Sequence, residues 1–289
     1  MRTVLLGPNG QLGTDIRAAN AARATPYDIL CIDRGKLDLS DIDKAVETLR
    51  ALEFDCLINC SSYHKTDDVE RNAQLGFTIN AHLPKALAQL CADKGSRLVH
   101  ISTDYVFGGQ EKRAPLGEQD GKAPLNVYGA SKGMGEDLVL RAGANALILR
   151  VASLFGVAGA SGKGGNFVET MIRFGREKGH LRVVSDQVMS PTSTADIAAA
   201  LLGLLAREAP AGIWHVVNSG SATWHEFAVE IIRRAKIPAD VEAIPSSAFP
   251  TPAARPPYSV LDNTKLASAI GPMRPWQDAL DSYLAAKGY

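Results

Sequence analysis

The chain has 289 residues, of which 46% are hydrophobic and 21% charged, and its formal net charge is zero. This composition is typical of a globular protein with a sizeable core. The balanced charge excludes the basic footprint of a nucleic-acid-binding protein, and no apolar run is long enough to cross a bilayer. We therefore expect a cytoplasmic protein without nucleic-acid or membrane partners.

The first half of the chain alternates short apolar runs with patterns of helical period. The apolar runs predict buried strands at residues 3–7, 29–33, 56–60, 97–102 and 146–151. The intervening segments predict helices at residues 11–23, 41–52, 73–93 and 128–142. Ser40 is placed to cap the second of these helices. Such alternation is typical of the α/β class, with a doubly wound parallel sheet and helices on both faces.

The second half of the chain is less regular. A glycine-rich loop at residues 156–165 precedes a predicted helix at 166–178. A further helix is predicted at 194–206, and a strand at 213–217 could extend the sheet. Five prolines then punctuate a long loop between residues 245 and 257, before a last helix at 275–286. Loops of this length in compact chains are usually functional or disordered.

The cysteines are best interpreted as buried free thiols. Three of the four, Cys31, Cys56 and Cys60, fall in apolar strand-like runs; the fourth is Cys91. Cys56 and Cys60 are four residues apart, but no second pair or neighbouring histidine accompanies them, so we predict no metal site.

A glycine-rich turn follows the first predicted strand and opens the first helix. Residues 7–13 read G-P-N-G-Q-L-G, in which glycines permit a tight turn and close approach of the backbone to a pyrophosphate. Asp33 lies twenty residues after Gly13, where a carboxylate can bind ribose hydroxyls. Arg34 could pair with a 2′-phosphate, so NADH and NADPH both stay open. The alternative is a structural turn followed by a surface aspartate.

Three side chains beside this cradle could reduce a carbonyl group. Thr103 follows the fourth predicted strand, and Tyr128 and Lys132 are spaced to share one face of the next helix. We expect Lys132 to lower the pKa of Tyr128, which then supplies a proton while the cofactor supplies hydride. Thr103 would polarise the carbonyl. Gly133 and Gly135 each weaken this helix by about 1 kcal/mol.

Several longer blocks accompany these motifs. They lie at residues 36–41 (KLDLSD), 59–63 (NCSSY), 101–107 (ISTDYVF), 183–187 (VVSDQ), 190–192 (SPT), 224–228 (WHEFA) and 250–262 (PTPAARPPYSVLD). Together with the cradle and the Tyr/Lys pair, they resemble the extended short-chain dehydrogenase/reductase superfamily. Within it, they resemble the dTDP-4-dehydrorhamnose reductase family over nearly the whole chain.

The resemblance implies a Rossmann-type sheet and a smaller, discontinuous α/β substrate domain. It places the NAD(P)-binding domain at residues 1–152, continued by about 193–218, and the substrate domain at 153–192 and 219–289. It implies reduction of the C4 ketone of a dTDP-linked 6-deoxy-4-keto-hexose to dTDP-L-rhamnose by NADPH or NADH. A nucleotide sugar is thus the implied partner, and a homodimer stays open.

The same resemblance assigns roles to individual residues. The catalytic residues would be Thr103, Tyr128 and Lys132. The cofactor would be bound by Gly7, Gly10, Gln11, Leu12, Asp33, Arg34, Asp38, Leu39, Ser61, Ser62, Tyr63, Tyr128 and Lys132. The sugar nucleotide would be bound by Asp104, Tyr105, Asn166 and Arg255.

Two departures from the family pattern bear on the substrate. A family tryptophan on the substrate side of the cleft is replaced by Ser153, and loss of a base–aromatic contact, worth about 1–3 kcal/mol, could change sugar or base preference. Residues 64–70 also differ, through drift in a surface turn or a shifted substrate edge. Another nucleotide-sugar 4-ketoreductase, an epimerase, or a non-catalytic NAD(P)-binding regulatory subunit stay as alternatives. Tyr105 replaces the acid that a related dehydratase places there, which argues against elimination.

Overall fold

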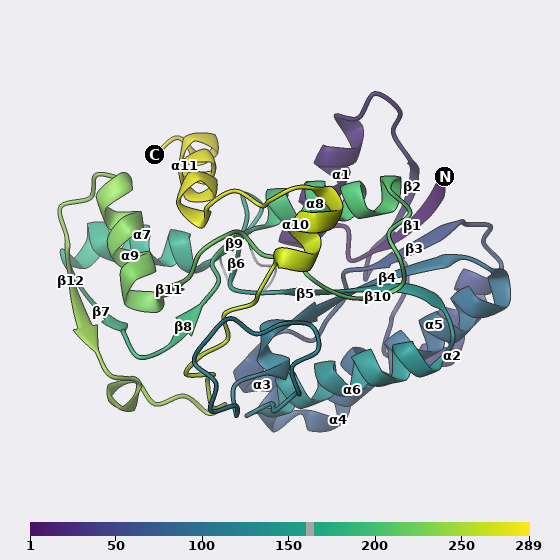
Figure 1. The fold of residues 1–289 in the computed structure, drawn as a ribbon, viewed down its shortest axis with the longest axis horizontal. Helices are drawn as coiled ribbons and strands as arrows, with labels where there is room; N and C mark the ends of the chain where they lie inside the picture. Colours follow the sequence, from purple (N-terminus) through teal and green to yellow (C-terminus); the bar gives the residue numbers. More distant parts are fainter. Residues whose placement is uncertain (160–164) are drawn as a thin grey trace.

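The computed structural model describes residues 1–159 and 165–289, so the predicted loop at 156–165 lies partly outside the described residues. Within that part of the chain, the largest sheet has six parallel strands in the order β2-β1-β3-β4-β5-β10 (Figure 1). The strands are β1 (Arg2–Leu6), β2 (Asp28–Ile32), β3 (Cys56–Asn59), β4 (Arg97–Thr103), β5 (Asn145–Val151) and β10 (Gly212–His215). All six were predicted, with ends that differ by at most two residues.

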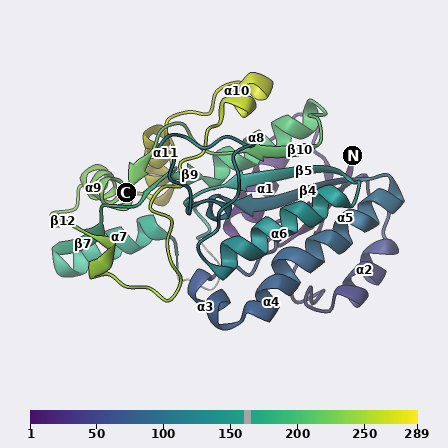
Figure 2. The ribbon, with the colours of Figure 1, turned by 60° about the horizontal axis from the view of Figure 1, so that its bottom comes forward.

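Helices cover both faces of this sheet, which confirms the predicted doubly wound α/β class (Figures 1 and 2). One face carries α1 (Gln11–Ala21) and α8 (Thr194–Ala206), and the other carries α2 (Ile42–Arg50), α5 (Leu83–Lys94) and α6 (Val127–Arg141). Successive strand residues point to opposite faces. Leu5 therefore packs in the core under α1 and α8, whereas Val4 and Leu6 pack in the core under α2 and α5.

A second apolar core lies beside the sheet (Figure 1). It is enclosed by α7 (Phe167–Lys178), α9 (Trp224–Arg234), α11 (Trp276–Lys287) and the parallel pair β7 (His180–Val184) and β12 (Asp240–Ile244). Trp276 is buried in this core, and Trp224 packs half-buried against it. Shorter elements complete the chain, namely β6 (Leu154–Phe155), β8 (Val188–Met189), β9 (Thr192–Ser193), β11 (Ala222–Thr223) and α10 (Thr264–Ile270). The predicted residue boundaries of two domains stay a prediction.

The predicted cap of α2 is wrong by one residue. The carboxylate of Asp41 caps the helix by accepting a hydrogen bond from the Lys44 N–H at 3.1 Å. Ser40 instead donates its hydroxyl to Asp38 at 2.7 Å, because the preceding carboxylate is within reach and competes for it.

The helix predicted at residues 73–93 is interrupted. It consists of α4 (Ala73–Phe77), a π-helical turn (Thr78–His82) and α5, preceded by the unpredicted α3 (Thr66–Arg71). Pro84 lies in the first turn of α5 and has no N–H to donate to the carbonyl of Asn80. The chain therefore widens into the π turn, which places Asn80 beside the carboxyl end of β3.

Glycines let α6 approach two backbone segments closely. A Cβ added at Gly129 would clash with the carbonyl oxygen of Tyr105, and a Cβ at Gly135 would clash with that of Asn80. At Gly133 the nearest atom would be a flexible part of Lys122 at 3.5 Å. Two of these glycines thus serve packing, which offsets their cost in helix propensity.

This difference in surroundings predicts opposite effects for alanine substitutions at two glycines that are two residues apart in α6. Gly135→Ala should destabilise the fold by about 1–3 kcal/mol, because backbone must move to admit the methyl group. Gly133→Ala, the matched control, should be neutral or stabilising by up to about 1 kcal/mol. Urea denaturation checks both values, and equal effects of the two substitutions would contradict the packing argument.

Candidate active site

The strand order reverses between β1 and β3, and ligands of doubly wound sheets bind outside the carboxyl ends of the strands at such a point. Gly7 follows β1 there with a φ of 75°, and a Cβ would lie 3.1 Å from the Cys60 carbonyl carbon. A Cβ at Gly13 would clash with the carbonyl oxygen of Gly7. The predicted glycine turn is therefore a tight cradle between β1 and β3.

The start of α1 suits a phosphate group. Gly10 occupies the N-cap position without a side chain to cap the helix, so the N–H groups of the first turn and the helix dipole face the cradle. Gln11 and Leu12 form that turn. The side-chain oxygen of Gln11 is buried and accepts no hydrogen bond from the described residues, so it could accept one from a ligand. These features fit a bound dinucleotide.

The segment after β2 holds the predicted ribose-binding group. Asp33 accepts hydrogen bonds from the N–H groups of Gly35 and Lys36 at 3.0 and 3.2 Å, which orient its carboxylate beside the cradle. Arg34 is exposed. Asp38 accepts hydrogen bonds from the N–H and hydroxyl groups of Ser40, and these bonds hold its pKa below the ordinary value. Leu39, which follows, is half-buried.

The loop after β3 is ordered by a residue that the sequence analysis missed. Asn80 accepts hydrogen bonds from the Ser62 hydroxyl at 3.1 Å and the Tyr63 N–H at 3.0 Å. It also donates to the Tyr63 carbonyl and to Ser131 of α6, each at 3.1 Å. Asn80 thus joins the predicted cofactor loop, which begins at Ser61, to the helix of the Tyr/Lys pair. A buried asparagine in an apolar helical pattern was the available signal.

The structure brings the predicted hydroxyl groups together. Thr103 ends β4, Tyr128 lies in the first turn of α6, and the Thr103 and Ser62 side chains lie beside the Tyr128 hydroxyl. Burial raises the pKa of Tyr128 to about 12, and these two side chains oppose the rise. The predicted net lowering of the Tyr128 pKa is therefore wrong for the chain alone, because desolvation of the phenol dominates.

Lys132 is buried and bound to the sheet. Its Nζ donates to the carbonyl of Ile101 at 2.5 Å and lies 3.4 Å from Nε2 of His100. Burial lowers the pKa of Lys132 to about 8, although Glu136 and Cys60 act in the opposite direction. The amine thus titrates near physiological pH.

Asp104 supports the site from within the protein. Its carboxylate is 2% exposed and accepts hydrogen bonds from Thr103 at 3.1 Å and Ser259 at 2.6 Å. Burial raises its pKa to about 6. The structure therefore places Asp104 behind Thr103, and its predicted contact with the sugar nucleotide stays a prediction.

Tyr105 lies next to Tyr128, and Arg255 lies near Tyr105. The ring of Tyr105 meets that of Tyr128 edge-on, with centroids 5.8 Å apart. Arg255 lies close enough to Tyr105 to favour its phenolate, and it pairs with Asp67 at 2.8 Å. Asp67 belongs to the divergent segment 64–70, so this departure from the family pattern borders the site.

The proline-rich loop that carries Arg255 is fastened over the start of α6. Asn126, the N-cap of α6, donates its side-chain N–H to the Ala254 carbonyl at 2.7 Å. Asp67 accepts the Ala253 N–H at 3.1 Å. Residues late in the chain therefore hold the helix that presents Tyr128.

Asn166 and Ser153 both follow β5, whose last residue, Val151, is paired with Thr103. Asn166 caps α7 and donates to Gly156 and Tyr283 at 3.0 and 3.2 Å, so its amide is occupied within the protein. Ser153 lies just beyond β5, half-buried, with a φ of 45° that non-glycine residues seldom adopt.

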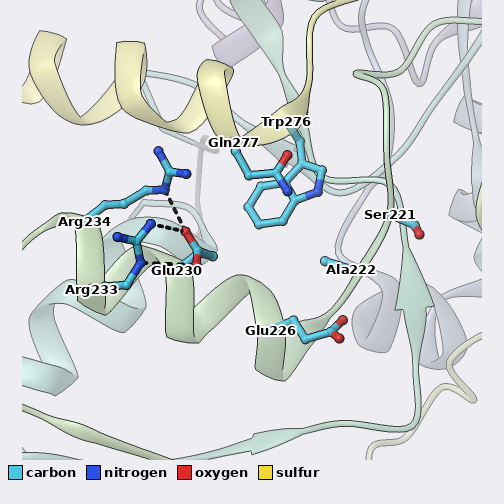
Figure 3. Close-up of a pocket in the computed structure, with 8 residues that line it drawn as sticks. All are labelled: Ser221, Ala222, Glu226, Glu230, Arg233, Arg234, Trp276 and Gln277. Atoms are coloured by element: carbon cyan, nitrogen blue, oxygen red, sulfur yellow. Dashed lines mark hydrogen bonds and ion pairs between the residues drawn. The ribbon is translucent and has the colours of Figure 1, made fainter.

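A separate surface pocket of about 400 Å³ lies between α9 and the start of α11 (Figure 3). Glu230 pairs there with Arg233 and Arg234, each at 2.7 Å, and the pocket contains none of the predicted site residues. In the described part of the chain, no group of three or more His, Cys, Asp or Glu side chains is arranged to hold a metal ion. All four cysteines are free; Cys56 and Cys91 are buried, whereas Cys31 and Cys60 are half-buried.

The raised pKa of Asp104 predicts a pH-dependent stability. Between its ordinary value of 3.8 and about 6, the folded chain binds more protons than the unfolded chain. The free energy of unfolding of the wild type relative to Asp104→Asn should therefore fall by about 2–3 kcal/mol as the pH rises through this interval. Urea denaturation across the interval tests this.

Asp67→Asn provides a control of opposite sign. Burial alone would raise the pKa of Asp67, but its bonds to Arg255 and Ala253 prevail and lower it. The wild type should therefore gain stability relative to Asp67→Asn as the pH rises through the acid range. A difference between the wild type and Asp104→Asn that is independent of pH would contradict the assignment of Asp104.

Comparison with known proteins identifies the family of this chain. The family model described as the RmlD substrate binding domain matches residues 1–288. The dTDP-4-dehydrorhamnose reductase of Mycolicibacterium smegmatis is 36% identical over 287 residues, which cover 99% of this chain and 85% of that protein.

Solved structures extend this agreement to the fold. The crystal structure of a dTDP-4-dehydrorhamnose reductase from Clostridium acetobutylicum matches with a TM-score of 0.92, 34% identity and full coverage of both chains. That of Bacillus anthracis, in complex with NADP, matches with a TM-score of 0.90 and 34% identity over 99% of each chain. The chain therefore belongs to the dTDP-4-dehydrorhamnose reductase family, described by the RmlD substrate binding domain model.

Proposed function

We propose that this chain uses NADPH or NADH to reduce the C4 ketone of a nucleotide-linked 6-deoxy-4-keto-hexose, with dTDP-4-dehydro-L-rhamnose as substrate and dTDP-L-rhamnose as product. The observation that carries the proposal is the meeting of Thr103, Ser62 and Tyr128 hydroxyls beside the glycine cradle. The family membership supports the reaction class, and the NADP bound by the Bacillus anthracis protein supports the cofactor.

In this mechanism, a dinucleotide held by its pyrophosphate at the glycine cradle would supply the hydride from its nicotinamide ring. Tyr128 donates its phenolic proton to the ketone oxygen. The Thr103 and Ser62 side chains beside Tyr128 favour the negative charge left on it. A charged Lys132 one turn away on α6 is proposed to favour the same charge. Tyr105 and Arg255 are proposed to contact the sugar nucleotide, and Asp104 to orient Thr103.

The proton-donor role predicts the effect of removing one oxygen atom. Purified wild type should consume NADPH or NADH when supplied with dTDP-4-dehydro-L-rhamnose. Tyr128→Phe should lower kcat by about 100-fold or more, while NADPH binding changes less than about twofold. Tyr27→Phe, at a tyrosine away from the site, is the control.

Two results would contradict the assignment. No consumption above background by the wild type would exclude the proposed reaction and favour a non-catalytic subunit. An unchanged kcat in Tyr128→Phe would exclude the proton-donor role. Because Ser153 replaces the family tryptophan, the assay includes other nucleotide-linked 4-keto-hexoses.

The exposed side chain of Arg34 leads to a prediction of how the protein discriminates between NADPH and NADH. If Arg34 pairs with a 2′-phosphate, Arg34→Ala should lower kcat/KM for NADPH by about tenfold, the equivalent of 1.4 kcal/mol, and leave NADH unaffected. Arg50→Ala, which removes a charge remote from the cradle, serves as the control. Equal losses with both cofactors would contradict the pairing.

Assembly and location stay predictions. Within residues 1–159 and 165–289, no helix combines the length and the apolarity needed to span a membrane. A homodimer is tested by light scattering of the purified protein, and a cytoplasmic location by cell fractionation.

A further inference from the structure

A buried chain of hydrogen bonds runs beneath the site, from the end of β3 to Lys132. Ser61 donates its N–H to the side-chain oxygen of Asn59 at 3.1 Å and its hydroxyl to the same oxygen. The Asn59 nitrogen lies 3.3 Å from Nδ1 of His100, and Nε2 of His100 lies 3.4 Å from Nζ of Lys132. Asn59, His100 and Lys132 are each 0–1% exposed.

The first bonds in this chain determine which nitrogen of His100 carries the proton. The oxygen of Asn59 is occupied by two donors from Ser61, so its NH₂ group faces His100. An amide NH₂ only donates, and Nδ1 must therefore offer a lone pair. Burial and the neighbouring Lys132 lower the pKa of His100 well below its ordinary value, so the ring is neutral and its single proton lies on Nε2.

With its proton on Nε2, His100 presents an N–H donor to the Nζ atom of Lys132. An ammonium group has three protons and no lone pair, so it cannot accept this hydrogen bond, whereas a neutral amine can. The carbonyl of Ile101 accepts one amine proton in either state. The other titratable groups that face Lys132 are Glu136 and Cys60, and both favour the ammonium form.

The negative charge of Glu136 is itself compensated by neighbouring cations. It forms a two-point ion pair with Arg150, lies 3.6 Å from Lys122 and accepts a hydrogen bond from Ser102. His100 is thus the group in contact with Lys132 that disfavours its charge.

We propose that His100, with its tautomer set by Asn59, is a positioning residue that limits the positive charge on Lys132 and thereby sets the upper pH limit of ketone reduction. The second half of this statement rests on the proposed function. The charged form of Lys132 favours the phenolate that Tyr128 becomes, so the rate declines as Lys132 loses its proton. Burial, which lowers the pKa of Lys132 to about 8, acts in the same direction as His100.

The test measures the titration of Lys132 directly, in the full chain without substrate or cofactor. Lysines are labelled with ¹³C at Cε, and the Lys132 resonance is identified by its loss in Lys132→Met. In His100→Gln, the amide can turn its oxygen toward Nζ and accept from the ammonium group. The Lys132 midpoint should rise by about one to two pH units.

A second variant reverses the direction of the hydrogen bonds between Asn59, His100 and Lys132 by a change at Asn59. In Asn59→Asp, the carboxylate only accepts, so the proton of His100 moves to Nδ1 and Nε2 offers its lone pair to Lys132. The midpoint should rise here as well. His215→Gln alters another buried histidine, which contacts Arg150 and not Lys132, and should leave the midpoint unchanged.

A midpoint in His100→Gln that stays within about 0.3 pH units of the wild type, or falls, would overturn the proposal. If that variant does not fold, the absence of a rise in Asn59→Asp overturns it. The pH profile of kcat/KM tests the kinetic half: its basic limb should move upward with the Lys132 midpoint, and an unmoved limb refutes this half. The titration needs no turnover, so failure of the proposed reaction leaves it interpretable.

Discussion

The close approach of α6 to two other backbone segments is the constraint on which the site depends. Without side chains at Gly129 and Gly135, the helix rests against the carbonyl groups of Tyr105 and Asn80. This contact brings Tyr128 within hydrogen-bond reach of Thr103 and places Ser131 beside the loop after β3. A helix displaced by the width of a methyl group would separate hydroxyl groups that come from three different elements.

A buried ion pair between α6 and the sheet also holds α6 in position. Glu136 of α6 accepts two hydrogen bonds from Arg150 of β5, each at 2.8 Å, and a third from Ser102 of β4 at 2.6 Å. Breaking one partner of such a pair typically costs about 3–5 kcal/mol, because the other charge is left without compensation. Helix α6 is therefore bound by directional contacts to β4, which ends in Thr103, and to the neighbouring strand β5, as well as by apolar packing.

The parts of this architecture that follow from local patterns could be predicted from the sequence. Each strand of the main sheet is a short apolar run, and the glycine turn can be recognised by its position between a strand and a helix. Asn80 could not be predicted in its role, because the π turn and its partners arise only when α5, β3 and α6 meet. The pKa of Tyr128 was misjudged because spacing along a helix carries no information about desolvation.

The fastening of the proline-rich loop has a consequence for how the protein is made. The cap of α6 is bound by Ala254, and the carboxylate behind Thr103 is bound by Ser259. During synthesis, the residues of the glycine cradle therefore leave the ribosome long before the residues that bind the cap of α6 and the carboxylate behind Thr103. The surroundings of Tyr128 and Thr103 are completed only by the last part of the chain.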